Sequence, residues 1–160
     1  MTDPMVGEAE TLASRRQSIE LSINDQFRPR TSRAFLEKVV SAALTHLDRM
    51  ELEVSLLLTD DAEIARIHGE YLGDATPTDV ISFPMEEVVE IVVSVERARA
   101  VAHEQGHAIC AEIALYVVHG ILHACGHDDM APASRARMRL AETEILTSIG
   151  QKVSPVDDGI

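Results

Sequence analysis

Aromatic residues are scarce in this chain of 160 residues, which contains no tryptophan, three phenylalanines and two tyrosines. A sizeable core is nevertheless possible, because 46% of the residues are hydrophobic. Such a core must be aliphatic, built on Leu, Ile, Val and Ala. The length is typical of one domain, and no repeat divides the chain. We therefore expect a single domain over residues 1–160, with a loose arm at residues 1–17 and a disordered tail at residues 151–160.

Basic residues are also few. The chain has 14 Lys and Arg against 27 Asp and Glu, which gives a formal net charge of −13. This balance argues against broad, non-specific binding of nucleic acid, because such binding needs many cations at phosphates. A small positive site on an acidic protein remains compatible with it.

The two cysteines are too few for a disulfide framework, and residues 1–18 lack the apolar segment of a signal peptide. These features predict a reduced, cytoplasmic protein. The most apolar stretch, residues 109–125, falls short of the ~20 apolar residues that a membrane span needs. It also contains Glu112, His119 and His123. It therefore indicates a helix buried in the core and no contact with a membrane.

Hydrophobic periodicity predicts an α+β domain with one mixed four-stranded sheet packed with about five helices. The strands are expected at residues 18–24, 51–58, 80–85 and 88–95. The first two helices should run to about residues 50 and 71 and the third from 95 to 105; the last two are expected at residues 109–125 and 133–149. Gly106 and Gly126 are the expected helix stops.

The segment from His119 to Asp129 carries the most specific chemical pattern. His119 and His123 are four residues apart, so on a helix their imidazoles lie on one face and can converge on one metal ion. A residue beyond the turn at Gly126 can supply a third ligand, and Asp129 and His127 are both available. Three protein ligands leave one position for water, which is typical of catalytic zinc.

This segment, HGILHACGHDD, resembles the HGxLHLxGYDH signature of the YbeY family, the single-zinc endoribonucleases of bacterial ribosomal RNA maturation. Residues 70–84, EYLGDATPTDVISFP, resemble the family's YRxxDxPTDVLSFP segment, and residues 90–95 match its GDIxIS strand in part. The resemblance places the third ligand on Asp129, where the family has histidine. It also shows Leu72 where the family has arginine, and Val89 and Glu90 where the family has Gly-Asp.

The resemblance implies hydrolysis of single-stranded RNA phosphodiesters in rRNA processing and ribosome biogenesis, with one Zn²⁺ per chain on His119, His123 and Asp129. It implies ribosomal RNA and the small ribosomal subunit as partners, and no nucleotide cofactor. A non-catalytic, zinc-containing ribosome-assembly factor is the alternative. The general base stays unassigned, with Asp128 and Glu90 as the candidates close in sequence.

A second pattern, formed by His103, Glu104 and His107, fits the H-E-x-x-H motif of zinc metalloproteases. Gly106 lies inside it and should break the helix that must hold both histidines. Its polar surroundings indicate a helix end at the surface. In addition, Gly120 stands where the His119–His123 motif of a protease would need glutamate, so peptide hydrolysis is not expected.

Polar residues also interrupt the apolar strand at residues 80–85 and the turn before it. Thr78, Asp79 and Ser82 can line a substrate groove, or they can cap the strand and satisfy the turn. Three arginines on the last helix, Arg135, Arg137 and Arg139, form either a solvated face or, if they border the zinc site, a guide for RNA.

Overall fold

The computed structural model describes residues 20–25, 31–73, 78–84 and 86–153. Four strands and five helices follow one another: β1 (Glu20–Asp25), α2 (Arg33–Leu47), β2 (Glu53–Thr59), α3 (Asp61–Leu72), β3 (Val80–Pro84), β4 (Val88–Ser94), α4 (Val95–Gln105), α5 (Ile109–Ala124) and α6 (Pro132–Ser148). The arm expected at residues 1–17, and residues 154–160 of the expected tail, lie outside the described residues.

The sheet has the order β1-β2-β4-β3. β1, β2 and β4 run parallel, whereas β3 pairs with β4 in the antiparallel direction. The prediction of one mixed four-stranded sheet is therefore confirmed. Pro84 ends β3, an edge strand, where its missing N–H disrupts no inner ladder.

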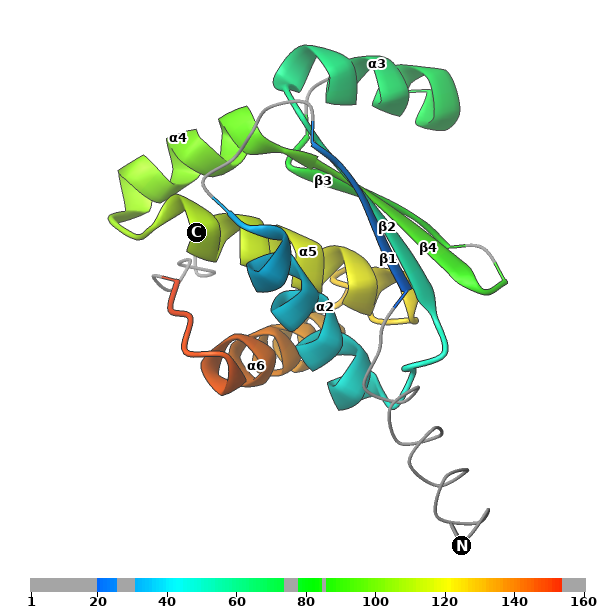
Figure 1. Cartoon of the computed structure of the whole chain (residues 1–160), viewed down its shortest axis with the longest axis vertical. Helices are drawn as coiled ribbons and strands as arrows, with labels where there is room; N and C mark the ends of the chain where they lie inside the picture. Colours follow the sequence, from blue (N-terminus) through cyan, green and yellow to red (C-terminus); the bar gives the residue numbers. More distant parts are fainter. Residues whose placement is uncertain (1–19, 26–30, 74–77, 85, 154–160) are drawn as a thin grey trace, which may run out of the picture.

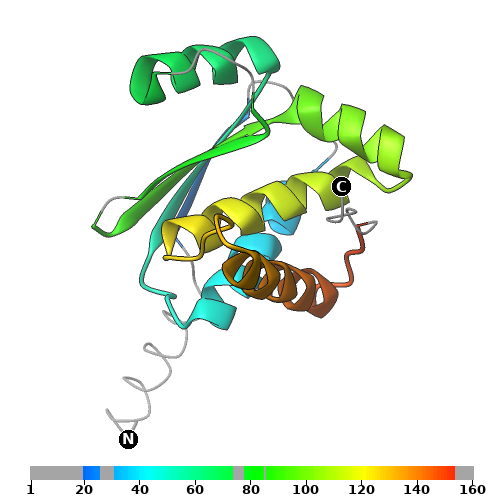
Figure 2. The same ribbon diagram turned by 180° about the vertical axis from the view of Figure 1, so that it is seen from behind.

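Helices cover the two faces of this sheet unequally. α2, α5 and α6 lie on one face, and α3 lies on the other (Figures 1 and 2). The main aliphatic core fills the space between the sheet and the first group of helices. A smaller cluster of Ile64, Ile67, Ile81 and Val92 joins α3 to β3 and β4. Alternate residues of β3 and β4 thus belong to different clusters, as the two-residue period of a strand requires.

α5 is the central helix and packs against α2, α4, α6, β3 and β4. A helix that is apolar nearly all round is expected to be buried, and most of α5 is. Its closest approach to the sheet is at Gly120, where a Cβ atom would lie 3.1 Å from Ile91 Cγ2 and 3.3 Å from Val80 Cγ2. The missing side chain therefore lets α5 pack tightly onto β3 and β4.

Among the described helices, none alone is long and apolar enough to cross a membrane. α4 and α5 taken as a pair pass that test by length and composition, and the chain bends by 120° between them.

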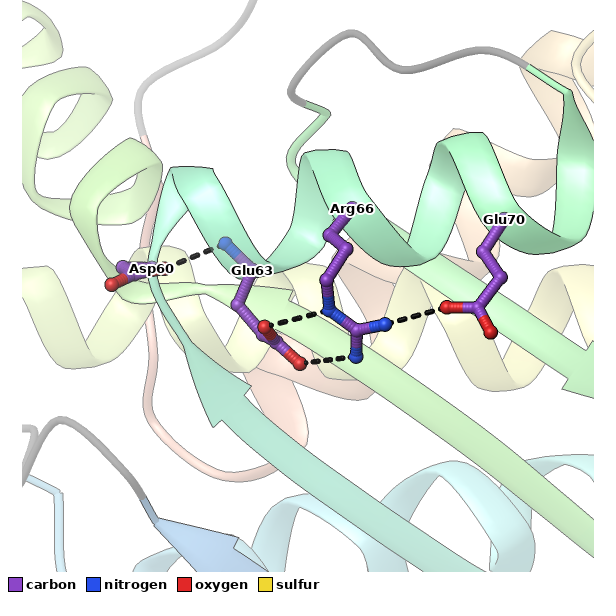
Figure 3. A network of polar contacts seen from close by, with 4 residues as sticks. All are labelled: Asp60, Glu63, Arg66 and Glu70. Carbon is purple, nitrogen blue, oxygen red and sulfur yellow. Dashed lines mark hydrogen bonds and ion pairs between the residues drawn. The ribbon is translucent and has the colours of Figure 1, made fainter.

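Side-chain caps set several helix boundaries. The Ser32 hydroxyl accepts a hydrogen bond from Phe35 N at the start of α2. The Asp60 carboxylate accepts one from Glu63 N, at 2.8 Å, at the start of α3. Figure 3 shows this cap together with Arg66, which bridges Glu63 and Glu70 along the exposed surface of α3.

A residue with a positive φ ends each of two helices, α4 and α2. α4 ends at Gln105 because Gly106 adopts a φ of 75°, so the predicted stop is confirmed. α2 ends at Leu47, three residues before the expected end, because Asp48 adopts a left-handed conformation with a φ of 54°. Asp tolerates that conformation better than most residues, since its short side chain can bond locally.

Candidate metal centre

His119 and His123 occupy the last two turns of α5. Their rings are parallel within 4°, and the ring centroids are 6.4 Å apart. The predicted arrangement on one helix face is therefore present. The His119 side chain is 34% exposed and His123 is exposed, so both imidazoles lie at the border between core and solvent.

His119 also contacts a carboxylate from another helix. Its Nδ1 atom lies 2.8 Å from Oε2 of Glu142 on α6, whose side chain is only 12% exposed. α6 packs beside α5 (Figure 2). The sequence analysis missed Glu142, although its position gives a signal: it falls among the buried residues Met138, Ala141 and Ile145. A carboxylate on the buried face of a helix needs a partner.

Further negative charge surrounds His119. Burial by itself would lower the pKa of this imidazole, but the hydrogen bond with Glu142 and the nearby carboxylates of Asp79 and Asp129 outweigh it and raise the pKa above its usual value. Asp79 and Asp129 therefore lie close enough to act electrostatically on His119. The same negative field favours a bound cation.

The segment after α5 carries both candidates for a third ligand. Gly126 has a φ of 104° and turns the chain, as expected, and His127 N donates a hydrogen bond to Leu122 O at 3.0 Å. Asp129 is exposed, and its carbonyl oxygen accepts a hydrogen bond from Arg135 Nε. Among the described residues, no three His, Cys, Asp or Glu side chains are gathered closely enough to hold a metal ion together. The choice between Asp129 and His127 remains a prediction.

Neither candidate for the general base is placed at the two histidines. The Asp128 carboxylate accepts hydrogen bonds from Ser134 Oγ at 2.8 Å and Met130 N at 3.0 Å, and these bonds lower its pKa. A carboxylate with a lowered pKa is a weak proton acceptor at neutral pH. Glu90 precedes Ile91, which faces Gly120 of α5. Strand alternation therefore directs Glu90 to the opposite face of the sheet.

The polar residues around β3 are Thr78 and Asp79 at its start and Ser82 within it. Asp79 Oδ1 accepts a hydrogen bond from Val80 N at 2.8 Å and lies 3.4 Å from Thr78 Oγ1, so both residues organise the start of the strand. Ser82 shares a face of β3 with Val80, which approaches Gly120. The Ser82 hydroxyl is buried and has no hydrogen-bond partner among the described residues. A substrate groove over Thr78, Asp79 and Ser82 remains a prediction.

A pocket of about 450 Å³, separate from the two histidines, lies between α2 and α6. Its lining includes Lys38, His46 and Glu144, and none of the candidate metal or groove residues.

The second histidine motif is broken, as expected. Gly106 ends α4, so His103 belongs to the helix and His107 lies beyond it. His103 and Glu104 are exposed, but the expectation of a surface position was wrong for His107. Its side chain is 8% exposed and its Nε2 atom contacts Oε2 of Glu112 on α5. The bend between α4 and α5 folds His107 over the first turn of α5.

Glu112 also acts on Tyr116, one turn along α5. Burial, with the carboxylates of Glu112 and Asp79, raises the pKa of Tyr116, so the phenol stays neutral. The His107 contact is thus part of a buried polar cluster of His107, Glu112 and Tyr116.

Known proteins resemble this chain along most of its length. The family model described as Endoribonuclease YbeY matches residues 18–150. The Endoribonuclease YbeY of Desulfitobacterium hafniense is 38% identical over 132 residues, which cover 72% of this chain and 83% of that protein. The protein of the same name from Roseiflexus sp. is 31% identical over 156 residues, covering 87% and 97% of the two chains.

The solution structure of TM1509 from Thermotoga maritima has a similar fold, with a TM-score of 0.58. The match covers 88% of this chain and 99% of that one at 22% sequence identity, and it supports the α+β architecture alone.

Proposed function

Because the chain belongs to the YbeY endoribonuclease family, we propose that it binds one zinc ion through His119, His123 and Asp129 and hydrolyses single-stranded ribosomal RNA. The family membership confirms the resemblance drawn from the sequence motifs. The chain is an endoribonuclease of rRNA maturation, and the family is one of metal-dependent nucleases. The identity of the metal, the ligand set and the single-stranded substrate belong to the proposal.

The parallel pair of imidazoles is the observation that carries this proposal. Imidazole and carboxylate are ordinary zinc ligands, and two histidines with one carboxylate leave a position for water. The contact between Glu142 and Nδ1 leaves Nε2 of His119 as the nitrogen that can bind a metal. The donor chemistry of the two histidines therefore suits zinc, and the negative charge around His119 supports the same proposal.

When bound, zinc would supply an acidic water and a Lewis acid for the phosphoryl oxygen. The side chains of the protein would bind and position the ion. His119 and His123 would hold it as neutral imidazoles, with Glu142 accepting the hydrogen bond from Nδ1–H of His119. Asp129 adds a carboxylate that offsets part of the charge of the cation. RNA is the substrate that the family implies, and the small ribosomal subunit is the proposed partner.

The described residues do not favour peptide hydrolysis as they favour hydrolysis of RNA. The residue after His119 is Gly120, and a Cβ atom there would already lie 3.1–3.3 Å from side chains of the sheet. A glutamate at this position has no room to reach the site. The alternative motif at His103 and His107 is divided by the end of α4.

The test compares purified protein with and without a metal chelator on a single-stranded RNA, its duplex and casein. We expect chelator-sensitive cleavage of the single strand, with the duplex and casein left intact. His123→Ala should lose both zinc and cleavage. His103→Ala, which changes an exposed histidine outside the site, is the matched control and should keep both.

Cleavage of casein with intact RNA would contradict the proposal. A protein that binds zinc but cleaves none of the substrates would point to the non-catalytic assembly role. Cleavage of RNA that persists in a zinc-free His123→Ala protein would refute the metal site.

A further inference from the structure

Glu142 is a carboxylate inside an otherwise apolar interface. Its neighbours on the buried face of α6 are Met138, Ala141 and Ile145, which are 1%, 5% and 1% exposed. Placing a carboxylate in such surroundings is unfavourable unless it is hydrogen-bonded. The described partner is Nδ1 of His119, at 2.8 Å. The residue pair therefore links α5 to α6 through one polar contact in the core.

This contact determines which nitrogen of His119 is available. A carboxylate has only acceptor oxygens when ionised, so the imidazole must be the donor and carry its proton on Nδ1. Nε2 then keeps its lone pair, and the hydrogen bond fixes the plane of the ring. In many metal sites a carboxylate orients a histidine ligand in this way without touching the metal.

His123 differs from His119 in this respect. Within the described part of the chain, its ring is parallel to that of His119 but has no side-chain hydrogen bond. It is also exposed, whereas Glu142 and α6 enclose one side of His119. His119 is thus held in one tautomer and orientation before any ligand binds, and His123 is not.

We infer that Glu142 is a positioning residue, which fixes the Nδ1–H tautomer and the orientation of His119 and thereby sets the metal affinity of the histidine pair. This inference rests on the proposed function for the identity of the ligand, because it takes zinc as the ion that Nε2 binds. The tautomer itself is a property of the metal-free protein and can be measured independently.

The experiment uses the full chain with three substitutions, Glu142→Gln, Glu142→Ala and Glu144→Gln. Glu144 is the matched control, since it lies two residues further on the same helix, and its side chain is 56% exposed and 3.9 Å from His46 Nδ1. Zinc affinity is measured by competition with a chromophoric chelator. The tautomer of His119 is read from its ring ¹⁵N chemical shifts in the metal-free protein.

We expect Glu142→Ala to weaken zinc binding by about 10–100-fold, the range found when such supporting partners of metal ligands are removed. Glu142→Gln should fall between that variant and the parent, because its amide oxygen can still accept from Nδ1. It also remains informative if the alanine variant fails to fold. Glu144→Gln should match the parent protein, and the ¹⁵N shifts should show Nδ1–H in the parent and a mixture of tautomers in Glu142→Ala.

Equal zinc affinity in the parent and both Glu142 variants would overturn the inference. So would a loss of the same size in Glu144→Gln, since a general charge effect would then explain it. If the parent binds no zinc, the proposed function fails, and the ¹⁵N shifts alone decide the positioning role: an Nε2–H tautomer in the parent would refute it.

Discussion

His119 and His123 have the same side chain but different surroundings, so their removal should have different consequences. His119 bonds to Glu142, whose side chain is 12% exposed, and His123 is exposed. His119→Ala leaves the Glu142 carboxylate buried without its described partner, which costs about 1–3 kcal/mol. We expect this loss in urea unfolding of the metal-free protein, whereas His123→Ala should leave the free energy of unfolding nearly unchanged. Equal stabilities of the two variants would contradict the structural role of the Glu142 contact.

His107 supports the fold through its contact with Glu112, and we expect it to bind no zinc. Glu112 is 3% exposed, and His107→Ala removes the imidazole that it contacts. Breaking a buried pair by removing one partner costs about 3 kcal/mol or more. We therefore expect a clear loss of stability in denaturant unfolding with an unchanged zinc content. His103→Ala should alter neither quantity, and loss of zinc in His107→Ala would revive the metalloprotease interpretation.

We predict that the third zinc ligand is Asp129 and not His127. Asp129 acts on His119 electrostatically, whereas His127 is tied to α5 by its backbone bond to Leu122. Zinc titrations of Asp129→Ala and His127→Ala should show a loss of affinity greater than about 100-fold only in the first, since loss of a ligand exceeds the roughly 10–100-fold effect of losing a supporting residue. The reverse pattern would assign the ligand to His127.

At the scale of single elements, α5 positions the histidines because it packs closely on the sheet. Gly120 makes this approach possible, with Ile91 and Val80 only 3.1–3.3 Å from the place of a Cβ atom. The backbone positions of His119 and His123, which lie before and after Gly120 on α5, are therefore fixed relative to β3 and β4. α2, α4 and α6 pack against α5, and α6 contributes Glu142 from its buried face.

Substitutions at Gly120 should reveal this packing. Gly120→Val adds atoms to a full interface, and such overpacking typically costs about 1–3 kcal/mol. Gly120→Ala should be milder, because the better helix propensity of alanine, worth up to about 1 kcal/mol, offsets the close contacts. Thermal unfolding monitored by circular dichroism measures both. A valine variant as stable as the parent would show that the interface is looser than described.

At the scale of the whole molecule, the net charge of −13 shapes how RNA is bound. Several of the arginines on the described surface are paired with glutamate, as Arg33 is with Glu37 and Arg66 with Glu63. The net negative charge opposes long-range attraction of RNA, so we expect recognition to depend on local contacts.

This charge predicts a weak dependence of RNA binding on salt. For single strands the slope of log K against log salt is roughly −0.7 for each phosphate neutralised. Because the chain has 14 Lys and Arg against 27 Asp and Glu, we expect a slope shallower than about −2 when KM is measured between 50 and 200 mM salt, as about three contacts or fewer would give. A slope steeper than about −5 would require a basic RNA-binding surface outside the residues described.

The sequence by itself determined the features that depend on neighbours along the chain. The four-residue spacing of His119 and His123, the aliphatic α5 and the stops at Gly106 and Gly126 all follow from helix geometry and backbone conformation, and the structure agrees. The end of α2 was missed by three residues, because many residue types can end a helix and Asp48 gives a weaker signal than glycine.

Only the tertiary structure decided which distant residues meet. Glu142 reaches His119 across 23 residues, and His107 is buried against Glu112 by the bend after α4. Glu90 faces away from α5 because its neighbour Ile91 is the residue that packs on Gly120. Local periodicity shows which face of an element is buried, but it does not say what covers that face. Packing of α5 between the sheet and α6 makes that choice, and it brings Glu142 into hydrogen-bonding contact with His119.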